Sequence, residues 1–366
     1  MGSVMTRSRN LTSLVALATW ATTMAGPATD GSAAGSPVSA RPVNLAPPAE
    51  KDGWIAPAQG QPSQPIWGIK GGIEVGLWPL RGPRGLIRVY APYLGNPAGH
   101  VINFIAVEPI AGARRDLSEL QESALDGVPG KRMWTGTEME ESPAPREPWA
   151  PAQPKFMRVG GGEAMTFFVF VEPFQNGARP IVQVILRKDR PREVSFRVFT
   201  AKGGAAMKAC VLTATMGNYA RLRRLWLKDE VVESTRLWPG FVPADPRAGG
   251  FARAKQWGVE RLARAGQDAI VAATPDETDP QKAAYAPNTP ATWRYEGLTA
   301  TQYWRAKAAP GLVARANGRR TYWSSNIEIP RGVAFENFEL LAPFAPGQEF
   351  TFGVTPDPPD RVMTSD

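Results

Sequence analysis

The chain contains almost no cysteine and almost no histidine. Among its 366 residues there is one cysteine, Cys210, and one histidine, His100. An intrachain disulfide is therefore excluded, and so is a zinc or iron–sulfur centre built from clustered Cys and His ligands. Cys210 stands within an apolar run and is expected to be a buried thiol that packs like a small hydrophobic residue. We predict no metal and no cofactor, and a fold whose stability rests on a large hydrophobic core.

Long hydrophobic runs are also missing, because no stretch reaches the roughly 18 apolar residues of a membrane-spanning helix. One shorter apolar run, residues 11–20, follows Arg7 and Arg9 and leads into the small residues around Ala25. A positive segment, a short apolar core and a small-residue exit together predict a secretory signal peptide over residues 1–25. We therefore expect a secreted or periplasmic protein with no transmembrane anchor once the signal has been removed.

Aromatic residues, glycine and proline are abundant. The 12 Trp, 15 Phe and 7 Tyr provide material for a core, whereas 36 Gly and 36 Pro favour many turns and few long helices. Residues 26–65, rich in Pro, Ala, Gly and Ser, are expected to form a flexible linker. Short β-prone runs fill residues 66–356, and residues 357–366 form a tail. The pattern predicts an all-β fold, a large two-layer antiparallel β-sandwich of supersandwich size with a short helical insertion at about 240–290.

The individual strands are predicted from β-branched and aromatic runs bounded by Gly or Pro. Residues 167–171 are continuously apolar, which indicates a strand covered on both faces, while residues 193–199 alternate as a half-buried strand does. Helices are expected at 117–125 and 251–265, and residues 220–232 form either a helix or a long strand. Further strands are expected at residues 72–78, 85–90, 101–108, 164–172, 180–187, 207–214, 269–273, 291–295, 301–306, 332–340 and 348–354.

The formal net charge is +8, and most charges are scattered along the expected strands. The main basic cluster, residues 221–224, is too short for a nucleic-acid-binding arm, so we expect no nucleic-acid partner. For an exported protein, polysaccharide or another glycan of the cell envelope is the better-matched partner. The simpler alternative is a solvated basic surface with no ligand. An acidic stretch at 276–279 lacks the spacing of a calcium-binding loop and is expected to be an acidic turn.

Three segments combine arginine or asparagine with aromatic side chains. Arginine can pair bidentately with a sugar carboxylate, and Trp or Tyr can stack on the apolar face of a sugar ring. The alternative for the aromatic residues is a place in the core. The predicted ligand-binding residues are Trp78, Arg84, Tyr93, Asn218, Arg221, Arg223, Trp323 and Asn326.

Groups suited to catalysis are fewer. If the protein is an enzyme, His100 or Tyr219 is the predicted base, and Arg221 or Arg223 would neutralise a uronate in a lyase reaction. No G-x-S-x-G motif is present, which disfavours a serine hydrolase. A glycoside hydrolase would need two carboxylates, for which solvated strand-end acids are the alternative interpretation. The candidate carboxylates are Glu108, Glu172, Glu336 and Glu339.

Three segments resemble a group of exported bacterial proteins to which no activity is assigned. They are Gly76-Leu-Trp-Pro with residues 85–93, residues 214–224, and residues 333–340 with 347–350. By strand count alone, the chain is also similar to the supersandwich domains of the galactose-mutarotase type, found in sugar epimerases and polysaccharide lyases. A mutarotase typically uses more than one histidine, and His100 is single here.

The leading hypothesis is an exported protein that binds polysaccharide through a cleft lined by aromatic and Arg side chains. Binding of an acidic polysaccharide is one form of this hypothesis. The alternatives are a carbohydrate-active enzyme, either a polysaccharide lyase or a glycoside hydrolase, and a structural protein of the cell envelope without a small ligand.

Overall fold

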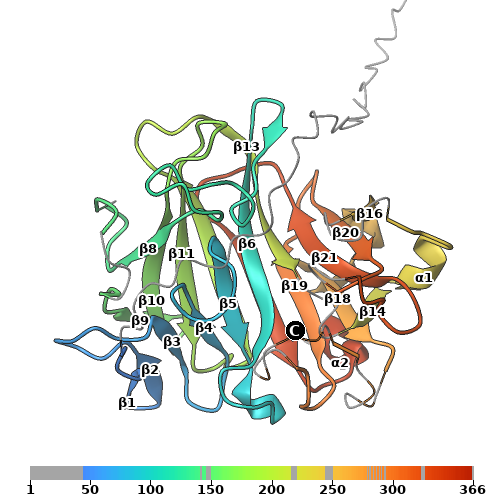
Figure 1. The fold of residues 1–366 in the computed structure, drawn as a ribbon, viewed down its shortest axis with the longest axis horizontal. Coiled ribbons are helices and arrows are strands. Elements are labelled where there is room, and N and C mark those ends of the chain that lie inside the picture. The colour runs from blue at the N-terminus through green and yellow to red at the C-terminus, as the bar shows by residue number, and fades with distance from the viewer. Residues whose placement is uncertain are drawn as a thin grey trace, which may run out of the picture. The chain divides into compact units, whose positions relative to one another are not determined.

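The structure is a computed structural model. It describes residues 44–364 except for 141, 146–149, 216–220, 244–249, 278, 280, 281, 283, 286, 288, 290, 292, 293 and 323–325. The predicted signal peptide, residues 1–25, lies outside the described residues. Two large antiparallel sheets pack face to face in the described part of the chain (Figure 1). None of its helices is long and apolar enough to cross a bilayer.

The first sheet has eleven strands among the described residues, and the longest of them lies near its middle (Figure 1). A short strand, β7 (Arg114–Arg115), pairs with β6 outside the main order. In spatial order the others are β1 (Ala49–Lys51), β2 (Trp54–Ala56), β3 (Ile66–Ile69), β4 (Glu74–Gly76), β5 (Leu86–Tyr90), β6 (Val101–Ala111), β13 (Met207–Thr215), β21 (Ala334–Leu341), β20 (Val313–Arg319) and β16 (Ala252–Gly258).

The second sheet also has eleven strands in the described part of the chain. Two of them, β17 (Ala263–Ala265) and β9 (Lys155–Val159), pair with β18 and β10 outside the main order. In spatial order the others are β15 (Val231–Glu233), β14 (Leu222–Trp226), β18 (Asp268–Pro275), β19 (Thr301–Lys307), β22 (Gln348–Thr355), β12 (Glu193–Thr200), β11 (Pro180–Arg187), β10 (Gly162–Val171) and β8 (Met133–Gly136).

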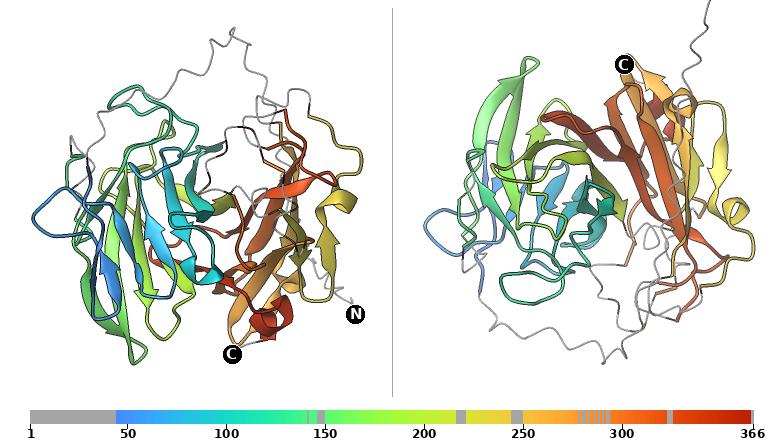
Figure 2. Two further views of the ribbon diagram at one scale, coloured as in Figure 1. Left: turned by 60° about the horizontal axis from the view of Figure 1, so that its bottom comes forward. Right: turned by 90° about the horizontal axis from the view of Figure 1, so that it is seen from above.

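Each sheet is built from both halves of the chain. In both views of Figure 2 the early strands, blue to green, lie on one side and the late strands, orange to red, on the other. The few helical segments lie between or after strands. They are η1 (Pro92–Leu94), α1 (Ser234–Leu237), η2 (Val259–Arg261) and α2 (Pro359–Thr364).

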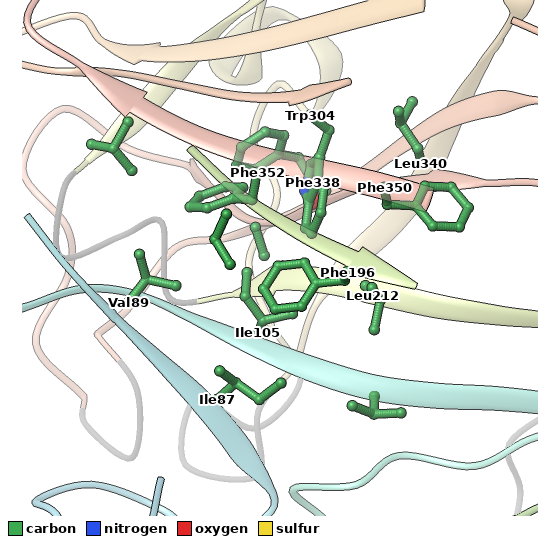
Figure 3. Close-up of a cluster of buried hydrophobic side chains, with 14 of the residues drawn as sticks. Ile87, Val89, Ile105, Phe196, Leu212, Trp304, Phe338, Leu340, Phe350 and Phe352 are labelled. Atoms are coloured by element: carbon green, nitrogen blue, oxygen red, sulfur yellow. The ribbon is translucent and has the colours of Figure 1, made fainter. Parts of the chain in front are cut away.

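The main core fills the space between the two sheets (Figure 3). Ile105 and Leu212 approach from the first sheet, and Phe196, Trp304 and Phe352 from the second. The Trp304 indole is fully buried, and its N–H donates across the interface to the carbonyl oxygen of residue 338 at 3.0 Å. A buried Trp N–H requires such a partner, so this bond fixes how the two sheets meet.

The predicted all-β sandwich is confirmed, as are its central strands. β11 coincides with the predicted residues 180–187. The prediction that residues 167–171 are covered on both faces is also confirmed, because Val169 lies in the main core while Phe168 and Phe170 pack with Trp134 on the opposite face. Cys210 is buried as expected. Burial in apolar surroundings raises the pKa of its thiol, so it stays protonated.

The predicted helices are wrong. Residues 251–265 form β16, η2 and β17, and residues 117–125 form turns. For residues 220–232, where a helix or a long strand was expected, the strand alternative holds, although as two strands, β14 and β15. β16 is the edge strand of the first sheet and exposes residues 253–256 on both faces. Its sequence therefore lacks the alternation of a half-buried strand, and its charged residues resemble the polar face of a helix. The stretch expected to be an insertion at about 240–290 therefore supplies strands to both sheets.

The predicted boundaries of the ordered domain are too narrow. β1 and β2 lie within residues 26–65, which were expected to be linker. Trp54 on β2 is 6% exposed and its ring lies 5.6 Å from that of Phe156 on β9. At the other end, α2 lies in the expected tail, and its Val362 is buried. Burial of these two side chains explains why the order extends beyond residues 66–356.

Candidate functional site

A basic hollow beside Trp78 brings together two of the predicted ligand-binding residues. Its empty space is about 260 Å³ with the open solvent at its mouth included, and the part that a water-sized group can enter is far smaller, so it admits only a small group of a ligand. Its walls come from the loop that follows β4 and from the chain segment that leads into β8. The lining residues are Trp78, Arg84, Gly85, Leu86, Lys131, Arg132 and Met133.

A buried arginine, Arg88 on β5, fixes the loop that carries Trp78 and Arg84 through hydrogen bonds to its backbone. The Arg88 side chain is fully buried and donates hydrogen bonds of 2.8–3.1 Å to the carbonyl oxygens of residues 80–83 and of Leu86. Nε and Nη1 each have one carbonyl acceptor and Nη2 has three, so every nitrogen of the guanidinium is engaged by the backbone. The loop is therefore fixed by hydrogen bonds to its backbone, and these hold the predicted ligand-binding residues Trp78 and Arg84 in position.

A second loop, residues 116–131, packs against the first at two glycines. A Cβ on Gly85 would lie 2.0 Å from the Ser118 carbonyl oxygen, and one on Gly130 would lie 2.6 Å from the Cβ of Arg84. Both glycines have positive φ, so a side chain would also strain the backbone there. The Ser118 hydroxyl donates to the carbonyl oxygen of Gly85 at 2.6 Å. These close approaches bring Lys131 next to Arg84.

Arg84 is the least satisfied basic group of the hollow. Its side chain is 8% exposed and lies over the Trp78 ring, 5.3 Å from the centroid. Nη1 donates to Asp126 at 3.1 Å. Within the described residues, its Nε and Nη2 are buried and have no hydrogen-bond partner. A buried unpaired N–H group costs free energy, so this edge of the guanidinium favours an acceptor.

Lys131, by contrast, is already paired. Its Nζ donates to the Glu122 carbonyl oxygen at 3.0 Å and lies 3.4 Å from a carboxylate oxygen of Glu172. The second oxygen of Glu172 accepts a hydrogen bond from Ser123 at 2.9 Å. Glu172, a candidate hydrolase carboxylate, therefore serves as the buried counter-ion of Lys131. The Arg132 side chain donates to the Pro145 carbonyl oxygen.

A second hollow of about 280 Å³ adjoins the first, and Trp78 and Met133 line both. Most of its lining residues are of apolar type, although polar and apolar atoms are exposed in it to a similar extent: Pro65, Leu77, Trp78, Met133, Trp134, Thr135, Pro145, Ala150 and Pro151. Trp78 thus lies between a hollow that contains basic side chains and one that contains none. A sugar ring combines polar substituents at its edge with an apolar face that an aromatic ring can contact.

Tyr93 and His100 belong to a different region, around η1. The Tyr93 hydroxyl donates to the Val354 carbonyl oxygen at 2.7 Å, and the Arg192 guanidinium lies 5.7 Å from its ring centroid. His100 is buried, with its ring 5.8 Å from that of Tyr295. Burial raises the Tyr93 pKa, which keeps the hydroxyl protonated at neutral pH. Neither residue lines the hollow beside Trp78.

Arg221 and Arg223 pair with the acidic turn that begins at residue 276. Arg221 lies 3.3 Å from Glu277, and Arg223 lies 3.1 Å from Asp276. Arg223 also donates to three backbone carbonyl groups, those of residues 330, 332 and 333. Both side chains are buried. The acidic stretch that the sequence predicted as a turn thus supplies the counter-ions of the predicted basic site.

The remaining predicted site residues give less information. Asn218, Tyr219 and Trp323 lie outside the described residues. Asn326 is exposed in the turn between the bridged residues Thr321 and Glu328. A catalytic group formed by His100 or Tyr219 with the arginines therefore stays a prediction.

Two candidate carboxylates, Glu108 and Glu339, meet on either side of Arg115. Arg115 Nε lies 2.5 Å from Glu108, while Nη1 and Nη2 lie 3.0 and 2.8 Å from the two oxygens of Glu339. Burial raises the pKa of Glu108 to about 8, whereas Arg115 holds that of Glu339 below its usual range. The guanidinium occupies the space between the carboxylates. That arrangement favours a structural cluster around Arg115 over a hydrolase pair, which would need that space for water or sugar. Glu336 pairs separately with Arg319.

Sequence reasoning missed Lys131, Arg132 and the supporting Arg88. Lys131 and Arg132 lie about 50 residues after Trp78. The aromatic residue that follows them is Trp134, so they did not stand out as a segment that combines basic and aromatic residues. Arg88 lies in an apolar strand, where an arginine between Ile87 and Val89 was the available signal of a buried partner.

Comparisons with protein-family models, with curated protein sequences and with solved structures found no match. The resemblance to exported bacterial proteins therefore stays a prediction. Among the described residues, no group of three or more His, Cys, Asp or Glu side chains is arranged to hold a metal ion.

Proposed function

We propose that the protein is an exported, secreted or periplasmic, glycan-binding protein, which binds acidic polysaccharide through the hollow beside Trp78. The observation that carries this proposal is the state of Arg84. Its guanidinium is buried, lines the hollow, and has two N–H groups without an acceptor. An anionic group of a ligand would satisfy both.

The surroundings of Arg84 support an anion more than a neutral ligand. Asp126 is 39% exposed whereas Arg84 is 8% exposed, so water screens the acid more than the base. The local field in the hollow is therefore positive. Arg132 lines the same hollow and adds to this sign, whereas the charge of Lys131 is balanced by the buried Glu172.

The position of Trp78 supports the proposal that the anionic group belongs to a sugar. It is partly buried, lines both hollows, and is held by the loop that Arg88 fixes. Aromatic rings of this kind bind the apolar face of a sugar while nearby polar groups bind its substituents. A polymer is favoured over a free sugar because the hollow is small and holds little of a ligand, so further contacts outside it must contribute.

Retention on immobilised polygalacturonate tests the proposal. We expect the purified protein to be retained at low salt and released as salt rises, because exposed parts of the interaction are screened. Arg84→Gln should weaken retention tenfold or more, as the loss of a charge-assisted bidentate contact implies.

Arg192→Gln is the matched control, since Arg192 also lies over an aromatic ring, that of Tyr93, and also pairs with an aspartate, Asp357. It removes the same charge at a different place. Equal weakening in the two variants would show that net charge alone is responsible, and no retention on any acidic polymer would contradict the proposal. Export is tested separately by fractionation and by sequencing the mature N-terminus.

A further inference from the structure

We infer that the hollow beside Trp78 is specific for the carboxylate of a uronate residue, which Arg84 binds side-on through Nε and Nη2. This inference rests on the proposed function and names the ligand chemistry of the same site. It follows from which nitrogens of Arg84 are occupied.

A guanidinium offers two kinds of two-donor edge. The end-on edge uses Nη1 and Nη2, and the side-on edge uses Nε and the Nη that lies on the same side. In Arg84 the Nη1 atom is engaged by Asp126 at 3.1 Å, and this breaks the end-on edge. The two nitrogens that remain without a partner, Nε and Nη2, together make the side-on edge. The free donors therefore form a complete fork, which matches two coplanar acceptor oxygens.

A carboxylate supplies two coplanar oxygens and no more. Both would be satisfied by the fork, at the spacing for which arginine is suited. A sulfate ester brings a third terminal oxygen that needs its own donor. Of the other basic groups that line the hollow, Lys131 already serves the Glu122 carbonyl and the buried Glu172 carboxylate, and Arg132 donates to the Pro145 carbonyl oxygen. The hollow thus provides donors for a carboxylate more completely than for a sulfate.

The fork is also rigid before any ligand arrives. Arg84 is confined by the Trp78 ring on one side and by Gly130, where even a methyl group would clash with its Cβ. Asp126 fixes the third nitrogen and itself accepts a hydrogen bond from the Val128 N–H at 3.1 Å. A preorganised fork loses little entropy when it binds, so the geometric match contributes directly to affinity.

The first part of the test compares three polymers on the unsubstituted protein and needs no variant. They are polygalacturonate, its fully methyl-esterified form, and a sulfated polysaccharide of similar charge density. We expect polygalacturonate to bind at least tenfold more tightly than the sulfated polymer, and the methyl ester not to bind. Arg84→Lys keeps the charge and removes the fork, so it should bind both anionic polymers weakly and alike. Arg192→Lys, the same change over Tyr93, should keep the preference of the unsubstituted protein.

Each outcome decides one claim. If the sulfated polymer binds as tightly as polygalacturonate, or the methyl ester binds as well as the acid, the carboxylate inference is overturned while acidic or general glycan binding survives. If Arg84→Lys keeps a tenfold preference for the carboxylate, the side-on fork is overturned as its cause. If none of the polymers is bound, the proposed function itself fails.

Discussion

Replacing Glu108 by glutamine should make the protein more stable at alkaline pH. Glu108 on β6 is 2% exposed, and burial raises the pKa of its carboxyl group to about 8 from an ordinary 4.5. Arg115 opposes this shift, but it divides its charge between Glu108 and Glu339 and gives the bidentate contact to Glu339. The desolvation of Glu108 therefore prevails, and the folded protein keeps a proton there at neutral pH.

The magnitude follows from linkage. One pKa unit corresponds to about 1.4 kcal/mol, so a displacement from 4.5 to about 8 is equivalent to roughly 5 kcal/mol of unfolding free energy. The folded pKa is the higher one. The contribution is therefore complete below pH 4.5 and is lost as the pH rises through about 8. Glutamine has the shape of the protonated acid and does not ionise, so Glu108→Gln should remove this loss.

Urea unfolding followed by Trp fluorescence, at intervals between pH 5 and pH 9, measures the effect. The unfolding free energies of the variant and the unsubstituted protein should agree near pH 5 and diverge in favour of the variant above it. The difference should grow by about 1.4 kcal/mol per pH unit until it levels off near pH 8. Glu349→Gln is the control, because this glutamate is 41% exposed and pairs with Arg197 on the surface. A difference that does not change with pH, or a variant that is less stable at pH 9, would refute the reasoning.

The other predictions concern buried side chains with defined partners. Arg88→Met should lower the unfolding free energy by about 3–5 kcal/mol, because it leaves the carbonyl groups of residues 80–83 without their donor, and it should also weaken polygalacturonate retention. Arg319→Met alone should lower the unfolding free energy by about 3 kcal/mol or more, because it leaves the buried Glu336 carboxyl group without its partner. The double variant Arg319→Met/Glu336→Leu should be nearly neutral, since the pair is buried at 3.6 Å and the guanidinium has no hydrogen-bond partner among the described residues. A double-mutant cycle by urea unfolding checks this, and additive costs would contradict it. Trp304→Ala should cost about 3–5 kcal/mol in the same assay, and a loss below 1 kcal/mol would show that the core reorganises around the gap.

The central strands could be predicted from the sequence because their burial is encoded locally. β10 and β11 are continuous β-branched and aromatic runs that no other structure explains as well. The edge strands could not. β16 exposes most of its side chains, and all but one residue of β9 are exposed as well, so neither carries an alternation that marks a buried face. β1 lies in a Pro- and Ala-rich segment whose order depends on its pairing with β2.

The candidate site was predictable only where its residues are close in sequence. Trp78 and Arg84 lie in one loop, and their proximity is visible in the sequence. Lys131 joins them through the close packing of two loops at Gly85 and Gly130, which no local pattern records. Whether an arginine can bind a ligand depends on its hydrogen-bond acceptors within the protein, and these are distant in sequence, as Asp126 is from Arg84 and Asp276 from Arg223.

That dependence separates Arg84 from the arginines that looked more distinctive in the sequence. Arg223 has an aspartate and three carbonyl oxygens as acceptors, so binding a ligand there would require breaking four contacts before any new one formed. Arg84 has one acceptor and an unused edge, so a carboxylate that reaches this edge would add two charge-assisted bonds without displacing a protein acceptor. The cost of exposing a buried, satisfied guanidinium is several kcal/mol, which exceeds what a surface sugar contact contributes. The number of occupied donors, rather than the density of basic residues along the chain, therefore identifies the hollow beside Trp78 as the candidate site.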